Sequence, residues 1–362
     1  MHTQNGLIIP GAGTKSMPAR RNFLAQAGGA VAGAIAAGTM LSSASAQASG
    51  SMSSGAASDN GSLASSSGGK GFWPNGARLA ISISLMFEGG GQPISGAAGI
   101  IPIPIDKGVP DLPTNAFFAY GQYEGIPRAL DLFDKHNIKV SSFMIGEAIK
   151  KWPDLAKEIV RRGHEAAAHG VTWSNSYNLS RSDEKRFIAE SADIIHRITG
   201  QQPVGWNAFF LRNSVHILET LQELGFIYHI DEPSHDEPFI IPVKGKDFVT
   251  VPYTFHLNDI SAYPFEGYNP IAYEQALKDE FDQLYEEGAT RRRLMVIGMH
   301  DRISGHANRI RALDRFFTYA KSKPGVWFAR KDEIARWTLA HRADTPILQR
   351  GPAAVSGLPG PG

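Results

Sequence analysis

The part of the chain that decides the fold is the stretch Ser84-Leu85-Met86-Phe87-Glu88-Gly89-Gly90. The apolar run over residues 79–87 predicts a buried strand. A carboxylate at the end of a strand, beside backbone without side chains, can face a substrate and act as a general base if its surroundings raise its pKa. No Gly-Lys-Ser/Thr follows the glycines, so this is not a phosphate-binding loop. From this stretch alone, an exposed loop glutamate remains the alternative interpretation of Glu88.

Downstream of this stretch, strand-like runs alternate with helical patterns, and no fixed-period repeat is present. Asn269-Pro270 predicts a helix start, because a capping side chain precedes a proline at the first helical position. Ser180 and Gly200 bracket another helix. This order implies right-handed crossovers and a mainly parallel sheet, and we expect an α/β fold with a distorted barrel of seven or eight units. The predicted strands span residues 79–87, 139–145, 164–169, 203–206, 226–230, 248–253, 294–300 and 326–329.

Composition bounds the domain organisation and excludes several functions. The chain has 362 residues and a formal net charge of +1, so it offers no basic field to nucleic acid. It contains no cysteine, which excludes disulfides, thiolate metal ligands and a cysteine nucleophile. We expect one large catalytic domain over residues 72–342, followed by a Pro/Gly-rich tail over residues 343–362.

Residues 1–46 have the pattern of a twin-arginine export signal. Arg20-Arg21 precedes a Gly/Ala-rich, weakly apolar stretch, and Ala44-Ser45-Ala46 supplies small residues for cleavage. The apolar stretch is too short and too rich in glycine for a bilayer span of about 20 residues, so we expect no stable membrane anchor. The Ser/Gly-rich composition of residues 47–71 predicts a flexible linker. We therefore expect export by the twin-arginine route to a periplasm or beyond the cell.

Candidate functional side chains fall at or just past the predicted strand ends, where parallel barrels place their chemistry. His169 follows a small-residue strand, and His300 ends an apolar one. An imidazole at position 300 can protonate a leaving nitrogen, and the neighbouring Asp301 can hold its tautomer. A structural role is the alternative for either histidine alone. Trp173 cannot bind a metal but can form the wall of a site for a planar substrate. The other candidates are Trp206, Asn258 and Asp259.

These residues resemble the pattern of the polysaccharide deacetylase (NodB-homology) superfamily, over nearly all of residues 72–340. In that family a strand ends in Phe-Asp-Asp-Gly, where the first Asp is the general base and the second binds a metal. A His-x-x-x-His pair adds two ligands, and a late histidine is the acid. The resemblance assigns the base to Glu88, the first ligand histidine to His169 and the acid to His300. Gly89 and Trp173 replace the other two ligands.

One histidine makes a poor metal site even with a carboxylate beside it, so we expect no bound cofactor. If a divalent metal such as zinc is bound, His169 and Glu88 would hold it. The departures from the family pattern resemble a branch of metal-independent allantoinases and cyclic-imide hydrolases, which have Glu at the base position and His-Gly-x-x-Trp in the ligand loop.

The resemblance to this branch implies hydrolysis of a C–N bond in a small cyclic amide, ureide or imide. Glu88 would deprotonate water, His169 would orient it or stabilise the oxyanion, and His300 would protonate the departing nitrogen. Backbone N–H groups of residues 89–91 are the expected oxyanion donors. Substrate-binding residues complete the expected site: Trp173, Trp206 and Tyr253 around a flat ring, and Asn258, Asp259 and Arg302 at its polar edge.

Two other functions stay open. The first is an exported, metal-dependent de-N-acetylase of polysaccharide or peptidoglycan, which export favours and the missing ligands oppose. The second is a degenerate barrel that binds carbohydrate without turnover, which the retention of both Glu88 and His300 opposes. The expected partner is accordingly a small amide, ureide or imide, or an N-acetylated glycan, and assembly into a homo-oligomer is left open.

Overall fold

The computed structural model describes residues 71–97, 101 and 103–349. The predicted export signal, the linker up to residue 70 and the tail from residue 350 lie outside these residues, and they stay predictions. The described residues all belong to one compact unit, Ser66–Gly362. Within them, no helix has the length and apolar character needed to cross a membrane.

The described chain alternates between strands and helices, as its sequence predicts. The strands are β1 (Leu79–Phe87), β2 (Ser141–Met144), β3 (Glu165–Ala168), β4 (Gly205–Trp206), β5 (Tyr228–His229), β6 (Phe239–Val243), β7 (Lys246–Thr250), β8 (Leu294–His300) and β9 (Val326–Phe328). The α-helices are α1 (Leu112–Tyr120), α2 (Ile126–Lys135), α3 (Gly146–Lys151), α4 (Pro153–Arg161), α5 (Arg181–Thr199), α6 (Ile217–Glu223), α7 (Asp259–Ala262), α8 (Pro270–Glu287), α9 (Ala307–Lys321) and α10 (Lys331–Ala340).

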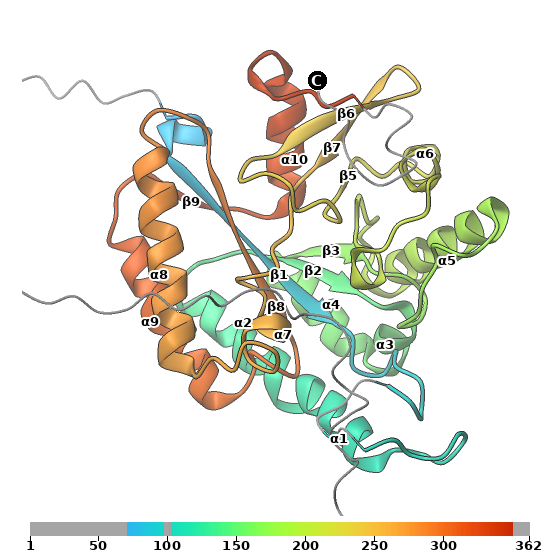
Figure 1. The fold of residues 1–362 in the computed structure, drawn as a ribbon. Helices are drawn as coiled ribbons and strands as arrows, with labels where there is room; N and C mark the ends of the chain where they lie inside the picture. The colour runs from blue at the N-terminus through green and yellow to red at the C-terminus, as the bar shows by residue number, and fades with distance from the viewer. Residues whose placement is uncertain (1–70, 98–100, 102, 350–362) are drawn as a thin grey trace, which may run out of the picture. The chain divides into compact units, whose positions relative to one another are not determined.

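The strands form one curled sheet in the order β6-β7-β5-β4-β3-β2-β1-β8, with β9 joined to β1 (Figure 1). Every ladder is parallel except that between β6 and β7. Helix α8 packs on β8, α4 and α5 pack on β3, and α10 packs on β6 and β7. The end strands β6 and β8 share no ladder in the described part of the chain, so the barrel is curled but incomplete. The predicted distorted α/β barrel is confirmed in this form.

Strand β1 is tied along both edges. One edge pairs with β8 from Ala80 to Met86. The other edge pairs first with β9, from Leu79 to Ile81, and then with β2, from Ser84 to Phe87. All nine side chains of β1 are buried, as expected for a parallel strand covered on both faces.

The two-residue period of the strands decides which side chains enter the barrel. Leu85 and Phe87 pack in the core beneath the helices, whereas Met86 packs in the core inside the barrel. Residue 88 continues the face of Met86, so β1 delivers Glu88 to the interior. The same alternation places His169 on the inner face behind Ala167, which packs in the inner core.

The helix-start predictions hold where a side chain reaches the backbone. Asn269 accepts hydrogen bonds from the amides of Ile271 and Ala272 at the start of α8. Ser180 accepts one from Asp183 N at the start of α5, and Gly200 ends that helix at φ 76°. Strand β6 and helices α1, α2, α3 and α7 have no counterpart among the predicted bounds. Pro242 interrupts the β pattern of β6, which an edge strand tolerates.

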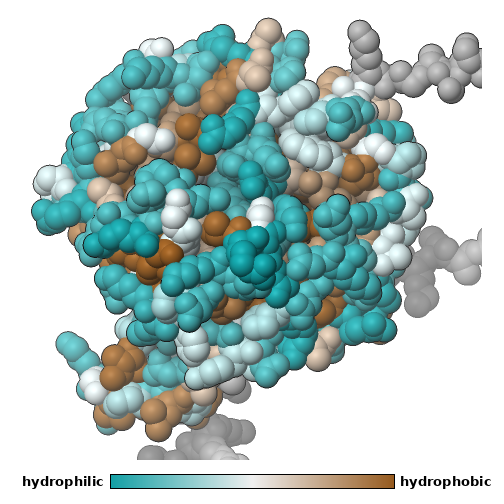
Figure 2. All heavy atoms as spheres, turned by 180° about the vertical axis from the view of Figure 1, so that it is seen from behind, coloured by the Kyte–Doolittle hydropathy of each residue, from teal (hydrophilic) through white to brown (hydrophobic). Residues whose placement is uncertain are grey.

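The surface opposite to the view of Figure 1 is mostly hydrophilic (Figure 2). Hydrophobic residues gather at the lower left of that view, over the segment that leads to α1. The exposed apolar side chains of that segment include Ile103, Val109 and Leu112.

Candidate active site

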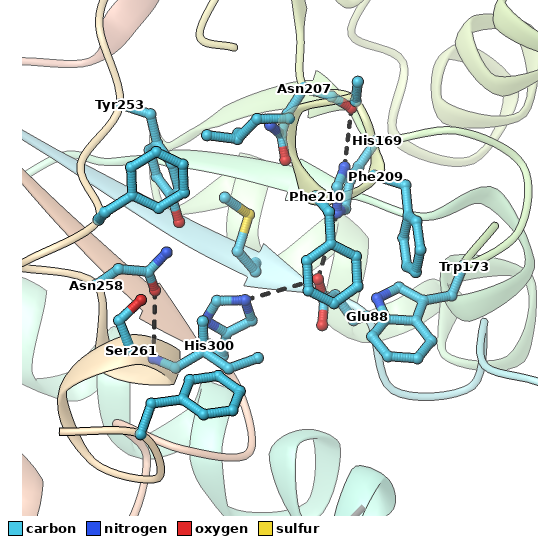
Figure 3. A pocket seen from close by; sticks show the side chains of 16 residues that line it. Glu88, His169, Trp173, Asn207, Phe209, Phe210, Tyr253, Asn258, Ser261 and His300 are labelled. Carbon is cyan, nitrogen blue, oxygen red and sulfur yellow. Dashed lines mark hydrogen bonds and ion pairs between the residues drawn. The ribbon is translucent and has the colours of Figure 1, made fainter. Parts of the chain in front are cut away.

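The three predicted catalytic side chains meet at the carboxyl edge of the sheet (Figure 3). Glu88 follows β1, His169 follows β3 and His300 ends β8. Glu88 Oε1 lies 3.3 Å from His169 Nε2 and 3.7 Å from His300 Nε2. All three side chains are buried. The parallel order β3-β2-β1-β8 brings together residues that are far apart in the sequence, and one carboxylate oxygen faces both imidazoles.

The orientation of His169 is set by a backbone carbonyl. His169 Nδ1 lies 2.9 Å from Asn207 O, and because a carbonyl only accepts, Nδ1 carries a proton. Nε2 therefore donates to Glu88 when the ring is protonated and presents a lone pair to the cavity when it is neutral. Asp231 Oδ1 fixes this turn by accepting from Asn207 Nδ2 at 2.7 Å and Ala208 N at 2.9 Å.

His300 is held by Asp259, at the start of the short helix α7. Its Nδ1 donates to Asp259 Oδ1 at 2.6 Å, and its amide donates to Oδ2 at 2.7 Å. The hydroxyl and amide of Ser304 also donate to Oδ2. Burial lowers the pKa of His300, but the charges of Asp259 and Glu88 outweigh burial and raise that pKa above its ordinary value. Asp301 was expected to hold this tautomer, and that prediction is wrong because Asp301 faces the other side of Glu88.

Arg302 forms a buried ion pair with the second oxygen of Glu88. Its Nη1 lies 2.6 Å from Glu88 Oε2, and its guanidinium stacks 4.1 Å from the ring centroid of Phe118. Burial raises the pKa of Glu88, but the charges of Arg302 and His300 outweigh burial and hold that pKa well below its ordinary value. From the sequence, a raised pKa was expected if Glu88 acts as a general base, and the structure does not show one. The site instead keeps Glu88 ionised.

Asp301 organises the backbone at the turn after β1. Its Oδ2 accepts from Glu88 N at 3.0 Å, Gly89 N at 3.2 Å and Gln122 Nε2 at 2.7 Å. Gln122 belongs to a π-helical turn between α1 and α2, a feature often found at functional sites. A Cβ added to Gly89 would lie 2.0 Å from Gln122 Oε1. The glutamine thus occupies the space that a side chain at position 89 needs.

The glycine amides are engaged within the turn itself. Gly89 N donates to Asp301, Gly90 N donates to Gln92 Oε1 at 2.7 Å, and Gly91 N donates to Glu88 O at 2.9 Å. The prediction that these amides stabilise an oxyanion is therefore wrong, because each already has an acceptor inside the protein.

The donor set at this site does not fit a divalent metal. Within the described part of the chain, no group of three or more His, Cys, Asp or Glu side chains is placed to hold one. His169 and Glu88 supply two ligands, fewer than the three that a catalytic zinc site generally takes from the protein. The guanidinium of Arg302 also occupies the remaining oxygen of Glu88, and its charge opposes a second cation there.

A cavity of about 250 Å³ opens above Glu88, His169 and His300. The predicted residues Trp173, Tyr253 and Asn258 line it. Figure 3 shows Trp173 on one side of Glu88, and Tyr253 and Asn258 on the other.

Three predicted substrate-binding residues do not line this cavity. Trp206 is buried against Phe226 on the helix side of the sheet. Asp259 lies behind His300, and Arg302 lies behind Glu88. Asp259 contacts His300 and Arg302 contacts Glu88, so neither is placed to contact a substrate in the cavity. Their predicted position at the polar edge of the substrate is therefore corrected.

The sequence analysis missed several residues that build the site. Gln122 lies in a segment without a strand-end signal, so no local pattern predicts its role. Asp231 directly follows the predicted strand over residues 226–230, and this strand end was the available signal for it. The cavity also has an aromatic mouth, formed by residues outside the predicted set. The consecutive pair Phe209-Phe210, just past β4, was the available signal for it. The missed lining residues include Asn207, Phe209, Phe210, Phe255, Ser261 and Phe265.

Comparison with known proteins agrees with this geometry. Residues 115–229 match the model of the polysaccharide deacetylase family. The crystal structure of a probable polysaccharide deacetylase from Pseudomonas aeruginosa PAO1 is 33% identical, with a TM-score of 0.70, and the match covers 74% of this chain and 93% of that one. The crystal structure of Puue allantoinase is 32% identical, with the same TM-score and coverage. A peptidoglycan deacetylase from Helicobacter pylori is 26% identical over 51% of this chain and 78% of its own length.

Deacetylases and allantoinases are both hydrolases of carbon–nitrogen bonds outside peptides, and a carboxylate between two imidazoles suits the proton transfers of such hydrolysis. This protein is an enzyme of that class. It belongs to the polysaccharide deacetylase (NodB-homology) superfamily, as the sequence resemblance implied.

Proposed function

We propose that the protein hydrolyses a C–N bond in a small cyclic amide, ureide or imide without a metal ion. The observation that supports this proposal is that the pKa values of two facing side chains, Glu88 and His300, are shifted in opposite directions. The pKa of Glu88 is lowered and that of His300 is raised, with 3.7 Å between Oε1 and Nε2. Titratable groups whose pKa values are pushed apart in this way supply a base and an acid at the same pH.

The reaction starts with a water molecule on the cavity side of Glu88 Oε1 and His169 Nε2, where it can contact both atoms. A carboxylate of low pKa is a weak base for free water, so the proton moves to Glu88 while the oxygen–carbon bond forms and the attacking water becomes acidic. His300 Nε2–H then protonates the ring nitrogen as the carbon–nitrogen bond breaks, which yields a carboxylic acid and a free amide or amine. Transfer of the proton from Glu88 back to His300 restores the starting state.

Charge on the carbonyl oxygen needs donors other than the glycine amides. Asn258 Oδ1 accepts from Ile260 N, so its Nδ2 is the end of the side chain that can donate to a substrate. The buried Tyr253 hydroxyl borders the cavity and interacts with the side chain of Asn258. Its O–H is a second donor that a substrate oxygen could accept from.

The size of the cavity supports a single small ring. Its volume of about 250 Å³ is below the range of roughly 300–1,000 Å³ typical of drug-sized ligands. Trp173 and Tyr253 offer flat faces to a planar ring.

The test is a hydrolysis screen of allantoin, hydantoin, succinimide and N-acetylated chitooligosaccharides, each with and without EDTA. We expect turnover of at least one cyclic compound, unchanged by EDTA. Glu88→Gln should lower kcat by about 10²- to 10⁴-fold, the usual contribution of a general base. Glu124→Gln, at an exposed carboxylate outside the cavity, is the matched control. Full activity of Glu88→Gln contradicts the proposal.

De-N-acetylation of a glycan is the second candidate, and the deacetylase relatives favour it. It predicts turnover of the chitooligosaccharides, loss of that turnover in EDTA, and about one equivalent of divalent metal in protein purified without chelator. Elemental analysis of that preparation separates the two candidates.

A further inference from the structure

We propose that the mouth of the cavity is a subsite for an aromatic or other apolar substituent on the ring that is hydrolysed. This inference rests on the proposed function and names its substrate class: a cyclic amide or imide that carries an aryl or alkyl group, rather than a polar ureide such as allantoin.

Apolar side chains form the mouth, and several remain accessible to solvent. Phe210, Phe255 and Phe265 line the cavity while 56%, 57% and 79% exposed, respectively. Large exposed aromatic side chains that converge on one opening are typical of a binding surface rather than of scattered surface residues.

The two sides of the mouth come from different segments of the chain. Phe209 and Phe210 follow β4, whereas Phe255 and Phe265 flank α7. Phe209 packs edge-on against Trp173, with 4.8 Å between ring centroids. In Figure 3, Phe210 and Trp173 lie beside Glu88. Their ring centroids are 6.1 Å apart, so the two side chains form one wall, and a ring bound at the carboxylate can extend its substituent along this wall.

The backbone that presents Phe210 is strained. Phe210 and Leu211 have φ values of 52° and 58°, a left-handed conformation that residues with a side chain rarely adopt. The turn is closed by hydrogen bonds from Leu211 N to Ala208 O at 2.9 Å and from Arg212 N to Phe209 O at 3.1 Å. Strain of this kind clusters at ligand-binding positions, where the surroundings hold a side chain in place for a purpose.

The chemistry of the mouth selects against polar substituents. The lining includes the polar side chains Asn207, Asn258 and Ser261, whereas the solvent-accessible side chains Phe210, Phe255 and Phe265 carry only phenyl groups. A ureide or a hydroxyl-rich sugar placed there would lose its water without gaining hydrogen bonds. An apolar substituent gains from the same desolvation.

The experiment measures binding and turnover separately. Binding of 5-benzylhydantoin, hydantoin and allantoin to full-length Glu88→Gln is followed by calorimetry, and kcat/KM for the same compounds is measured with the wild-type enzyme. We expect 5-benzylhydantoin to bind about 10- to 100-fold more tightly than allantoin, from the apolar area that it buries. Phe210→Ala and Phe265→Ala should each reduce this ratio by about fivefold or more. Ile271→Ala, an exposed apolar residue outside the cavity, should leave it unchanged.

Equal or tighter binding of allantoin overturns the subsite, as does an unchanged ratio in both phenylalanine variants once circular dichroism shows that they are folded. Failure of the wild-type enzyme to hydrolyse these three compounds and succinimide overturns the proposed function. In that case the affinity ratio in Glu88→Gln still decides whether the subsite exists.

Discussion

Replacing Arg302 by methionine removes the cation that keeps Glu88 ionised, and its effect can be worked out from the structure. The two side chains are 2% and 4% exposed, with 2.6 Å between Nη1 and Oε2. For charge centres about 4 Å apart and an effective dielectric constant of about 20, the Coulomb attraction is about 4 kcal/mol. That energy corresponds to about 3 pKa units. The pKa of Glu88 should therefore rise by about this amount toward its ordinary value of 4.5, because the charge of His300 and the hydrogen bond from His169 still oppose the effect of burial.

The assay is the pH dependence of kcat/KM, which reports the ionisation of the free enzyme. In the wild-type enzyme the acidic limb should lie well below pH 4.5, and in Arg302→Met it should move up by about 3 units, toward pH 4.5. Stability gives a second readout. With its lowered pKa, Glu88 stabilises the wild-type fold above pH 4.5 and loses that contribution as the pH falls. In the variant the pKa of Glu88 lies close to its unfolded-state value, so most of this loss of unfolding free energy at acidic pH should disappear.

Arg302→Lys is the matched control, because it keeps the charge and loses the planar fork. It should leave the acidic limb where it lies in the wild-type enzyme. An acidic limb that does not move in Arg302→Met refutes the assignment of the ionisation of Glu88 to this ion pair.

Three further perturbations test the remaining parts of the site and fold. Asp259→Asn removes a charge that raises the pKa of His300, so the alkaline limb of kcat/KM should move to lower pH. An unmoved limb contradicts that role. Gly89→Asp should not create a metal site detectable by elemental analysis, because Arg302 donates to Glu88 Oε2 and its charge opposes a second cation there. Stoichiometric metal in the single variant is the opposing result. Gly205→Ala places a Cβ 2.0 Å from the buried Tyr228 ring, so urea denaturation should show about 2–4 kcal/mol less unfolding free energy, and an unchanged midpoint argues against this packing.

The sequence predicts the barrel and its catalytic edge because these depend on local patterns. Alternating and continuous apolar runs identify β1 and β8, and parallel pairing then forces the residues after them to one edge. Glu88, His169 and His300 are therefore within reach of sequence reasoning, although they are far apart in the chain.

The supporting partners of these residues depend on tertiary structure. Asp301 is next to His300 in sequence, yet Asp259, 41 positions away, holds the imidazole. Adjacent residues on a strand end face different directions, so sequence neighbourhood assigns the wrong carboxylate. Arg302 was expected to face the substrate for the same reason. The aromatic mouth lies on loops, where no periodicity indicates which side chains converge.

Strand β1 is hydrogen-bonded along both edges, whereas the aromatic residues at the cavity mouth lie on loops. The strand and the loops therefore differ in how easily they open. A strand hydrogen-bonded along both edges exchanges its amides only when most of the domain opens, whereas the loops that carry Phe210 and Phe265 can open locally. The proposed general base therefore stands at the end of a strand that is tied along both edges, and the proposed substrate-selecting residues stand on loops. Mutations at the mouth can change which amide is accepted without changing the positions of Glu88, His169 and His300. One barrel can therefore give rise to hydrolases with the same chemistry and different substrates.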